Sequence, residues 1–278
     1  MSMSLPLLTT KFNLPPATPS LVQRARLSGL LDEGLRSGHL LTLICAPTGY
    51  GKTTLVSQWV HQHAEADSRA ASYDRQFIWL TLDQGDNDLA RFISYLVAAL
   101  QQIQAGVGQG TLIALQNVRS TSPHVLATLL INDLSVLANP FILVLDDYHT
   151  IDAISIQDFM SYLIDHQPPQ LHLVIISRGD PPLPLVRLRA RGQLTEIRQL
   201  DLALTVAETS EFLVQHMGLD LLPEQLHVLE SRTEGWVAGL QLAALSMRHT
   251  EDIPAFIQAF SGGHEYIADY LTSEVLEQ

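Results

Sequence analysis

The sequence Ala46-Pro-Thr-Gly-Tyr-Gly-Lys-Thr-Thr54 is the strongest indication of the fold. Its first eight residues match the P-loop template G-x-x-x-x-G-K-[ST] at every defined position except the first, where alanine replaces glycine. Alanine is also small, and the later glycines can still adopt the backbone angles that such a loop needs. The apolar run 40–45 before the loop predicts a buried strand, and a helix is expected from Lys52 to about His63. Strand, loop and helix in this order predict a cradle for phosphate groups.

The residues of this loop have separate expected roles. Backbone N–H groups of the loop and of the following helix N-terminus would point at the phosphates. Lys52 is expected to act as a catalytic residue that reaches the β- and γ-phosphates, Thr53 to ligate Mg²⁺, and Thr54 to face the α-phosphate. The predicted nucleotide-binding residues of the loop are Pro47, Thr48, Gly49, Tyr50, Gly51, Lys52, Thr53 and Thr54. A glycine-rich turn without a ligand is the alternative.

An acidic motif, Leu143-Val-Leu-Asp146-Asp147, completes the predicted site. It ends a continuous apolar run, and the carboxyl ends of parallel strands are where open α/β sheets bind ligands. Asp146 is expected to bind Mg²⁺, through a water molecule, and Asp147 is the candidate for polarising the attacking water. A loop-capping carboxylate is the alternative for Asp146. For Asp147 a role outside catalysis also stays open, because the polarising residue is often glutamate.

Arginines follow the next apolar run, 171–177. In P-loop folds with an extra strand between the two motif strands, the tip of that strand faces the γ-phosphate. Arg178 would then report whether this phosphate is present, through a charge-assisted contact that ADP cannot make. An exposed arginine at a strand end is the alternative. Four more arginines predict either a basic hinge near the nucleotide or a solvated linker: Arg187, Arg189, Arg191 and Arg198.

Strand and helix patterns alternate as far as about residue 203. Strands are predicted at 40–45, 76–82, 141–146, 171–177 and 194–200, and helices at 21–35, 52–63, 87–104, 122–137 and 154–166. This alternation predicts an α/β fold with a five-stranded, mostly parallel sheet flanked by helices. Helices alone are predicted afterwards, at 205–216, 223–232, 235–248 and 253–278. The expected division is an extended lead-in (1–20), a P-loop nucleotide-binding domain (21–203) and a smaller all-helical domain (204–278), incomplete at its C-terminal end.

Composition narrows the class of protein. The 278 residues carry a net charge of −13, so a broad basic face for nucleic acid is excluded, and any contact with DNA must come from elsewhere. The single cysteine, Cys45, excludes an internal disulfide and a cysteine-based zinc site. Neither an apolar run of membrane-spanning length nor a secretory signal is visible, which favours the cytoplasm and argues against a membrane partner.

Several stretches together carry a family resemblance. They are Leu14-Pro15 with Leu21-Val-Gln-Arg24-Ala-Arg-Leu27, the P-loop with Gln58-Trp59, Trp79-Leu-Thr-Leu-Asp83, Leu145-Asp-Asp-Tyr-His149, Ser177-Arg178, Leu188-Arg-Ala-Arg-Gly192 and Glu234-Gly-Trp-Val-Ala-Gly-Leu240. The chain resembles the STAND class of signalling NTPases. It is most similar to the N-terminal nucleotide-binding part of the MalT-like large LuxR-type transcriptional activators, from about residue 11 to the end.

This resemblance implies a switch driven by slow ATP hydrolysis. The ADP form would rest, and the ATP form would self-associate. The adenine would lie against the backbone of Val22, Gln23 and Arg24. An inducer of unknown identity would act through C-terminal domains outside this chain, and so would the DNA-binding helix-turn-helix. A stand-alone P-loop kinase, which needs an acceptor pocket and a lid, is one alternative, and a module that binds nucleotide without hydrolysis is another.

Overall fold

A computed structural model describes residues 6–16, 22–67, 75–116, 121–248, 250 and 252–260. The strands are β1 (Leu41–Cys45), β2 (Gln76–Thr81), β3 (Phe141–Asp146), β4 (Leu171–Ser177) and β5 (Leu194–Arg198). The helices of the α/β part are α1 (Ala25–Arg36), α2 (Lys52–Asp67), α3 (Leu89–Leu100), α4 (Gln109–Leu115), α5 (Pro123–Ser135), α6 (Ile154–Asp165), α7 (Leu185–Ala190) and α8 (Gln199–Leu202), with 3₁₀ turns η1 (Thr9–Phe12), η2 (Gln84–Asp86) and η3 (Tyr148–Thr150). The helical part contains α9 (Val206–Ser210), the π-helix η4 (Glu211–His216), α10 (Pro223–Thr233), α11 (Val237–Met247) and α12 (Ile253–Ala259).

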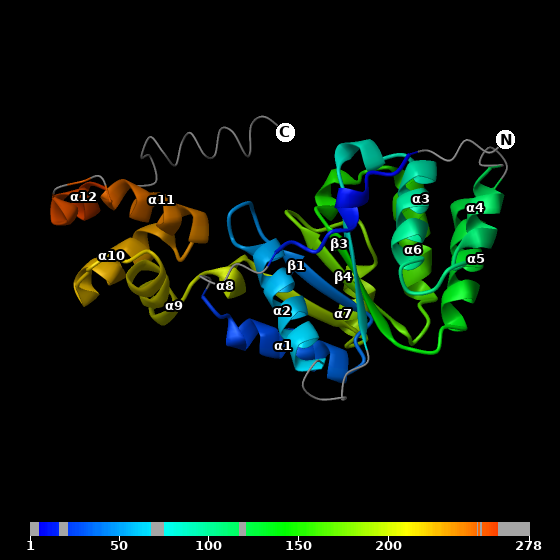
Figure 1. Cartoon of the computed structure of the whole chain (residues 1–278), viewed down its shortest axis with the longest axis horizontal. Coiled ribbons are helices and arrows are strands. Elements are labelled where there is room, and N and C mark those ends of the chain that lie inside the picture. The colour runs from blue at the N-terminus through cyan, green and yellow to red at the C-terminus, as the bar shows by residue number, and fades with distance from the viewer. Residues whose placement is uncertain are drawn as a thin grey trace.

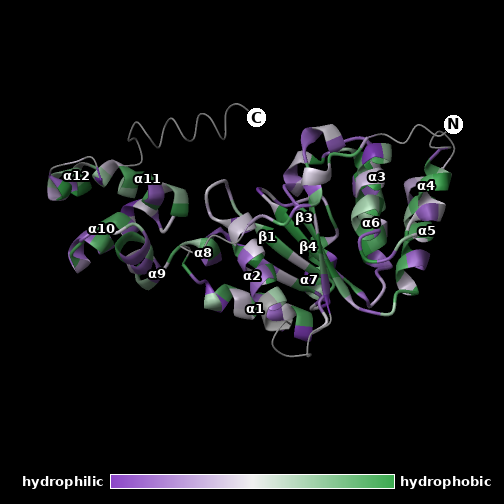
Figure 2. Cartoon of the chain, in the orientation of Figure 1, coloured by the Kyte–Doolittle hydropathy of each residue, from purple (hydrophilic) through white to green (hydrophobic). Residues whose placement is uncertain are grey.

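The sheet has the strand order β2-β3-β4-β1-β5, and neighbouring strands are parallel. β4 lies between the two motif strands, β1 and β3, as the interpretation of Arg178 requires. Every residue of β1, β3 and β4 is buried, because helices cover both faces of the sheet. This explains why these strands are continuous apolar runs, which Figure 2 shows in green at the centre of the α/β part.

Two hydrophobic clusters fill the space between the sheet and its helices. Leu27 and Leu31 of α1 and Trp59 of α2 belong to the cluster on one face. The cluster on the other face includes residues of α3 to α7, among them Phe92 and Phe159. Figure 1 shows the same arrangement, with α1 and α2 on one side of the strands and α3 to α6 on the other. The predicted α/β fold is thus confirmed, and its sheet is parallel throughout the described strands.

The N-terminal segment is held at the edge of the sheet by a buried lysine. The Nζ of Lys11 lies 2.6 Å from a carboxylate oxygen of Asp83, also pairs with the fully buried Asp86, and lies over the ring of Tyr95. Burial of an unpaired charge is costly, so the two carboxylates stabilise the buried ammonium group of Lys11. The expected extended lead-in therefore contains one 3₁₀ turn, η1; residues 1–5 and 17–20 lie outside the described part.

The helical part has its own core. It includes Leu213, Leu229, Leu240 and Ala243, and Val22 from the N-terminal side of the chain joins it. Figure 1 shows these helices, in yellow to orange, to one side of the sheet. Among the helices that the structure describes, none combines the length and apolarity needed to cross a membrane.

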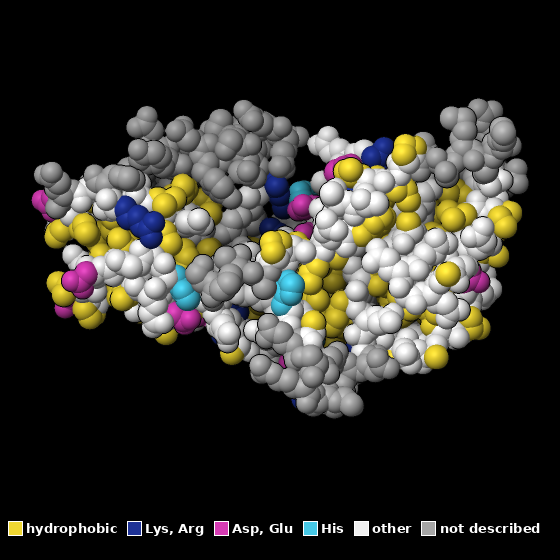
Figure 3. Space-filling model, viewed as in Figure 1, with side chains coloured by type: hydrophobic (Ala, Val, Ile, Leu, Met, Phe, Trp, Pro, Cys, Tyr) yellow, Lys and Arg dark blue, Asp and Glu magenta, His cyan; other side chains and the backbone are white. Residues whose placement is uncertain are grey.

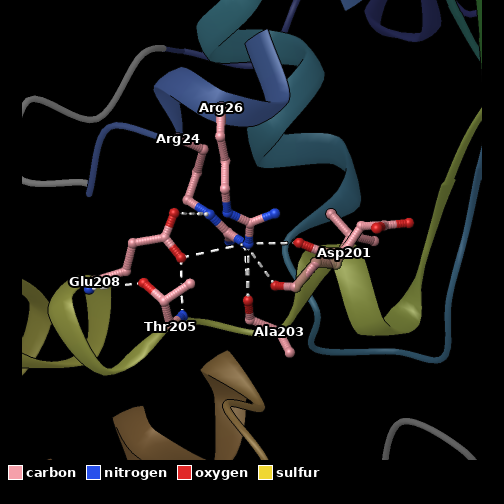
Figure 4. Close-up of polar contacts among 7 residues, drawn as sticks. Arg24, Arg26, Asp201, Ala203, Thr205 and Glu208 are labelled. Carbon is pink, nitrogen blue, oxygen red and sulfur yellow. Dashed lines mark hydrogen bonds and ion pairs between the residues drawn. The ribbon is translucent and has the colours of Figure 1, made fainter. Parts of the chain in front are cut away.

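Arg24 links the two parts of the molecule. Its side chain is 6% exposed, and its guanidinium donates to the carbonyl of Leu202 at 2.7 Å and to Glu208 Oε1 at 3.2 Å. Longer bonds run to the carbonyls of Asp201 and Ala203 (Figure 4). Arg24 precedes α1 with non-helical backbone angles (φ −92°, ψ 58°), so the helix predicted at 21–35 begins only at Ala25.

Other elements also differ from the expected ones. α4, α7 and α8 are absent from the predicted set, because helices of four to seven residues show too little periodicity to be recognised. The helix predicted at 205–216 is divided into α9 and the π-helix η4. The helix predicted at 253–278 is described as α12, which stops before the extended Phe260, and residues 261–278 lie outside the described part.

Candidate functional site

The P-loop occupies the turn between β1 and α2. Gly49 and Gly51 have φ angles of +83° and +76°, which residues with a Cβ rarely adopt. Lys52 is the first residue of α2, and its Nζ donates a hydrogen bond of 3.0 Å to the carbonyl of Pro47. Burial lowers the pKa of Lys52, as does Arg178, while Asp147 and Asp146 oppose this effect. The charges of Arg178, Asp147 and Asp146, all predicted for the site, thus act on the ammonium group of Lys52.

The acidic motif meets the P-loop through one hydroxyl group. Thr53 Oγ1 donates to Asp146 Oδ1 at 3.1 Å, and the backbone N–H of Asp147 donates to the same oxygen at 2.9 Å. Burial raises the pKa of Asp146 to about 7, and the neighbouring charge of Asp147 adds to the rise. A carboxylate and a hydroxyl are oxygen ligands of the kind that Mg²⁺ prefers, and Mg²⁺ sites commonly take few protein ligands beside phosphate oxygens. Thr53 and Asp146 therefore fit a magnesium ion.

A polar cavity opens above these residues, at the carboxyl ends of β1, β3 and β4. It is lined by Thr48, Gly49, Gly51, Lys52, Thr53, Thr54, Asp147 and Arg178. The structure thus brings the three predicted catalytic residues, Lys52, Asp147 and Arg178, to one cavity. Asp147 has a φ of +55°, an unusual value for a residue other than glycine and one that often accompanies functional sites.

Three of the residues predicted to bind the phosphates or Mg²⁺ do not line the polar cavity. Asp146 is 3% exposed and lies behind Thr53. Tyr50 is buried, and its hydroxyl accepts a hydrogen bond of 2.8 Å from the amide of Gln199. Pro47 contributes its carbonyl to Lys52. Tyr50 can therefore approach a ligand only through its backbone, and Pro47 acts through Lys52.

A second, mostly apolar cavity adjoins the polar one and shares Gly51 and Thr54 with it. Its lining is Val22, Arg24, Gly51, Thr54, Leu55, Gln58, Leu204, Phe212, Val237 and Gln241. Val22 and Arg24 were predicted on the adenine side, whereas Gln23 is exposed and outside this lining. The helical part supplies Leu204, Phe212, Val237 and Gln241, so both parts of the molecule form the walls.

Sequence reasoning did not assign His149 or Trp236 to the site. His149 lies near Asp147, with 3.9 Å between Nδ1 and Oδ1, and burial and Arg178 lower its pKa. The indole N–H of Trp236 donates to the carbonyl of Thr48 at 3.0 Å. Both residues belong to stretches that carry the family resemblance, which was the one available signal. Figure 3 shows basic, acidic and histidine side chains gathered where the two parts of the molecule meet.

Three of the four arginines predicted as a hinge or linker, Arg187, Arg189 and Arg198, lie in regular elements and form ion pairs, so neither description fits them. The fourth, Arg191, is exposed and follows α7. Arg187 of α7 pairs with Asp165, and Arg189 binds Glu196 through two bonds of 2.7 Å. Arg198 of β5 pairs with Asp180 and Glu196. These ion pairs link α7 to α6 and to β5.

Curated proteins with similar sequences include two transcriptional regulators. The HTH-type transcriptional regulator MalT of Cronobacter sakazakii is 36% identical over 272 residues, which is 97% of this chain and 29% of that protein. MalT of Klebsiella pneumoniae is 34% identical over 273 residues, with 98% and 29% covered. The chain thus spans less than a third of the length of these curated relatives. These matches confirm the predicted resemblance to the nucleotide-binding part of MalT-like regulators.

Solved structures support the fold. The Walker-type ATPase PABY2304 of Pyrococcus abyssi superposes with a TM-score of 0.58 at 16% identity, covering 96% of this chain and 78% of that one. Cdc6p of Pyrobaculum aerophilum gives 0.52 at 15% identity, covering 87% and 66%. In addition, the family model for the AAA ATPase domain matches residues 22–176, which include the P-loop, the acidic motif and most of β4. The chain therefore belongs to the AAA ATPase domain family.

Proposed function

We propose that this chain is a nucleotide switch that binds ATP or ADP with Mg²⁺ and belongs to a MalT-like transcriptional regulator. The observation that carries this proposal is the pair of adjoining cavities, one polar and one apolar, that share Gly51 and Thr54. A nucleotide likewise has a polar half, its phosphates, and a flatter, less polar half, its base. Residues 21–203 would form the nucleotide-binding domain, and residues 204–278 the helical domain that closes the base side.

In this proposal each polar side chain contacts a defined part of the ligand. Lys52 binds the β- and γ-phosphates, and Thr54 faces the α-phosphate. Thr53 and Asp146 hold Mg²⁺, which neutralises phosphate charge, and Asp147 orients a water molecule for attack. Lys52 and Arg178 both line the polar cavity. The positive charges of their side chains would stabilise the triphosphate there.

The apolar cavity supports adenine over guanine as the base. A guanidinium is the side chain that best pairs with the two adjacent acceptors of guanine. Arg24 lines this cavity, but its guanidinium donates to Leu202 and Glu208. These bonds occupy the group that would pair with guanine. The amides of Gln58 and Gln241 also line the cavity, and an amide offers the donor and acceptor that match adenine.

Arg178 is the proposed sensor of the γ-phosphate. The ATP form would self-associate and the ADP form would rest, with hydrolysis well below about 1 s⁻¹, the low end of ordinary turnover. With a net charge of −13 this chain would not itself bind DNA. An inducer and a DNA-binding helix-turn-helix would act through other domains. Ion pairs engage Arg187, Arg189 and Arg198, so these arginines do not favour the lid that a kinase would need.

The sensor role can be tested by measuring affinities for Mg-ATP and Mg-ADP in the wild type and in Arg178→Ala. A charge-assisted contact contributes roughly 1.5–3 kcal/mol, so the preference for ATP over ADP is expected to fall about tenfold or more. Arg191→Ala is a matched control, because Arg191 is exposed and outside the linings of both cavities. An unchanged ratio in Arg178→Ala, or an equal fall in the control, would remove the sensor role.

A further inference from the structure

The tip of the P-loop is hydrogen-bonded to the beginning of α11. Trp236, the residue before this helix, donates its indole N–H to the carbonyl of Thr48 at 3.0 Å. Ala238, in the first turn of the helix, donates its backbone N–H to the carbonyl of Gly49, also at 3.0 Å. The indole bond joins residues 188 positions apart in the sequence. Two successive carbonyls of the loop are thus held by the helical part.

The indole is closely packed between two glycines. A Cβ on Gly49 would lie 2.6 Å from both Trp236 Nε1 and the Cβ of Ala238, and a Cβ on Gly239 would lie 2.6 Å from the indole ring. Contacts this short do not occur between real side chains, so both positions require glycine for the helix to approach the loop. The Trp236 ring centroid also lies 6.5 Å from that of Tyr50. The contact is therefore specific in shape as well as in hydrogen bonding.

Peptide geometry relates these carbonyls to the phosphate site. A peptide unit is planar, and in the trans form its C=O and N–H point in opposite directions. The carbonyl of Thr48 shares a unit with the N–H of Gly49, and the carbonyl of Gly49 shares one with the N–H of Tyr50. Holding both carbonyls toward α11 therefore turns both N–H groups away from it. Gly49 lines the polar cavity, which is where the proposed function places the phosphates.

We propose that Trp236 is a positioning residue for nucleotide binding, which acts by orienting the P-loop amides from the helical part. This inference rests on the proposed function. Because binding linkage is reciprocal, a nucleotide that these amides bind must also strengthen the contact between α11 and the loop. The helical part then senses the phosphate site directly through the loop backbone.

The test compares Trp236→Phe with Trp79→Phe. Both variants replace an indole by a phenyl ring and lose one hydrogen bond, but the Trp79 indole donates to Thr81 Oγ1 in β2, at the edge of the sheet. Loss of the indole bond at Trp236 is expected to weaken Mg-ADP binding about fivefold, the equivalent of one ordinary hydrogen bond. The affinity of Trp79→Phe should match that of the wild type, with circular dichroism showing that both variants are folded.

A second readout uses the wild type itself. Mg-ADP should slow hydrogen exchange of the Ala238 amide, and this protection should shrink in Trp236→Phe. Equal Mg-ADP affinity in Trp236→Phe and the wild type, or no effect of Mg-ADP on the exchange of Ala238, would overturn the positioning role while leaving nucleotide binding intact. A wild type that binds no nucleotide would instead overturn the proposed function, and this inference with it.

Discussion

Replacing Arg24 by methionine should loosen the junction between the two parts of the molecule. Methionine keeps most of the apolar stem but removes the guanidinium, leaving the Leu202 carbonyl without this donor and Glu208 with only the longer ion pair to the more exposed Arg26. The two lost bonds, at 2.7 and 3.2 Å, are charge-assisted and each contributes roughly 1.5–3 kcal/mol. Breaking a buried charge pair by removing one partner costs about 3–5 kcal/mol. We therefore expect the free energy of unfolding of Arg24→Met to fall by about 4 kcal/mol.

Urea denaturation of the two variants Arg24→Met and Arg26→Met gives the comparison. The Arg26 side chain also reaches Glu208, at 3.4 Å, but it is 40% exposed, so its loss should cost less than about 1 kcal/mol. A helical part that detaches early would also broaden the transition of Arg24→Met. Equal midpoints for both variants, or a loss below about 1 kcal/mol in each, would refute the reasoning from burial.

Packing and titration give two further predictions. A Cβ on Gly34 would lie 2.1 Å from Thr195 Oγ1, so Gly34→Ala should lose about 1–3 kcal/mol of stability. Gly29 is on the same helix, and a Cβ there would meet nothing within 4 Å, so Gly29→Ala should gain up to about 1 kcal/mol of stability. Urea denaturation should therefore show changes in the free energy of unfolding of opposite sign for the two variants. Burial lowers the pKa of His172 to about 4. Between about pH 6.5 and 4, His172 is therefore protonated in the unfolded chain but not in the folded chain. The free energy of unfolding should therefore fall by up to roughly 3 kcal/mol between pH 6.5 and 4, and a slope in His172→Gln as steep as in the wild type would contradict this assignment.

The parts of the fold that the sequence predicts well are those with strong local patterns. β3 and β4 begin and end where their apolar runs do, because every residue in both strands is buried. The helix predicted at 122–137 is α5, and Ser122 caps it by accepting a hydrogen bond from the N–H of Val125. The P-loop and the acidic motif meet because parallel strands bring their carboxyl ends to one edge of the sheet.

The contacts across long sequence separations could not be predicted. Nothing near Arg24 in the sequence indicates that its partners lie at residues 201–208, or that the helix expected from residue 21 begins only at Ala25. The approach of Trp236 to Thr48 depends on how the helical part packs, which local periodicity does not encode. Tyr50, predicted from its place in the loop, points into the core because Gln199 and Trp236 lie beside it.

We propose that the P-loop of this chain binds nucleotide phosphates through Lys52. Isothermal titration of the purified protein with Mg-ATP and Mg-ADP tests it most directly, with Lys52→Ala as the matched variant. The side chain of Lys52 lines the polar cavity, so its removal takes away one charge-assisted contact to the phosphates. We expect micromolar binding by the wild type, on the order of −8 kcal/mol, and its loss or great weakening in a folded Lys52→Ala. Equal binding by the two proteins, or no binding by the wild type, would contradict the account.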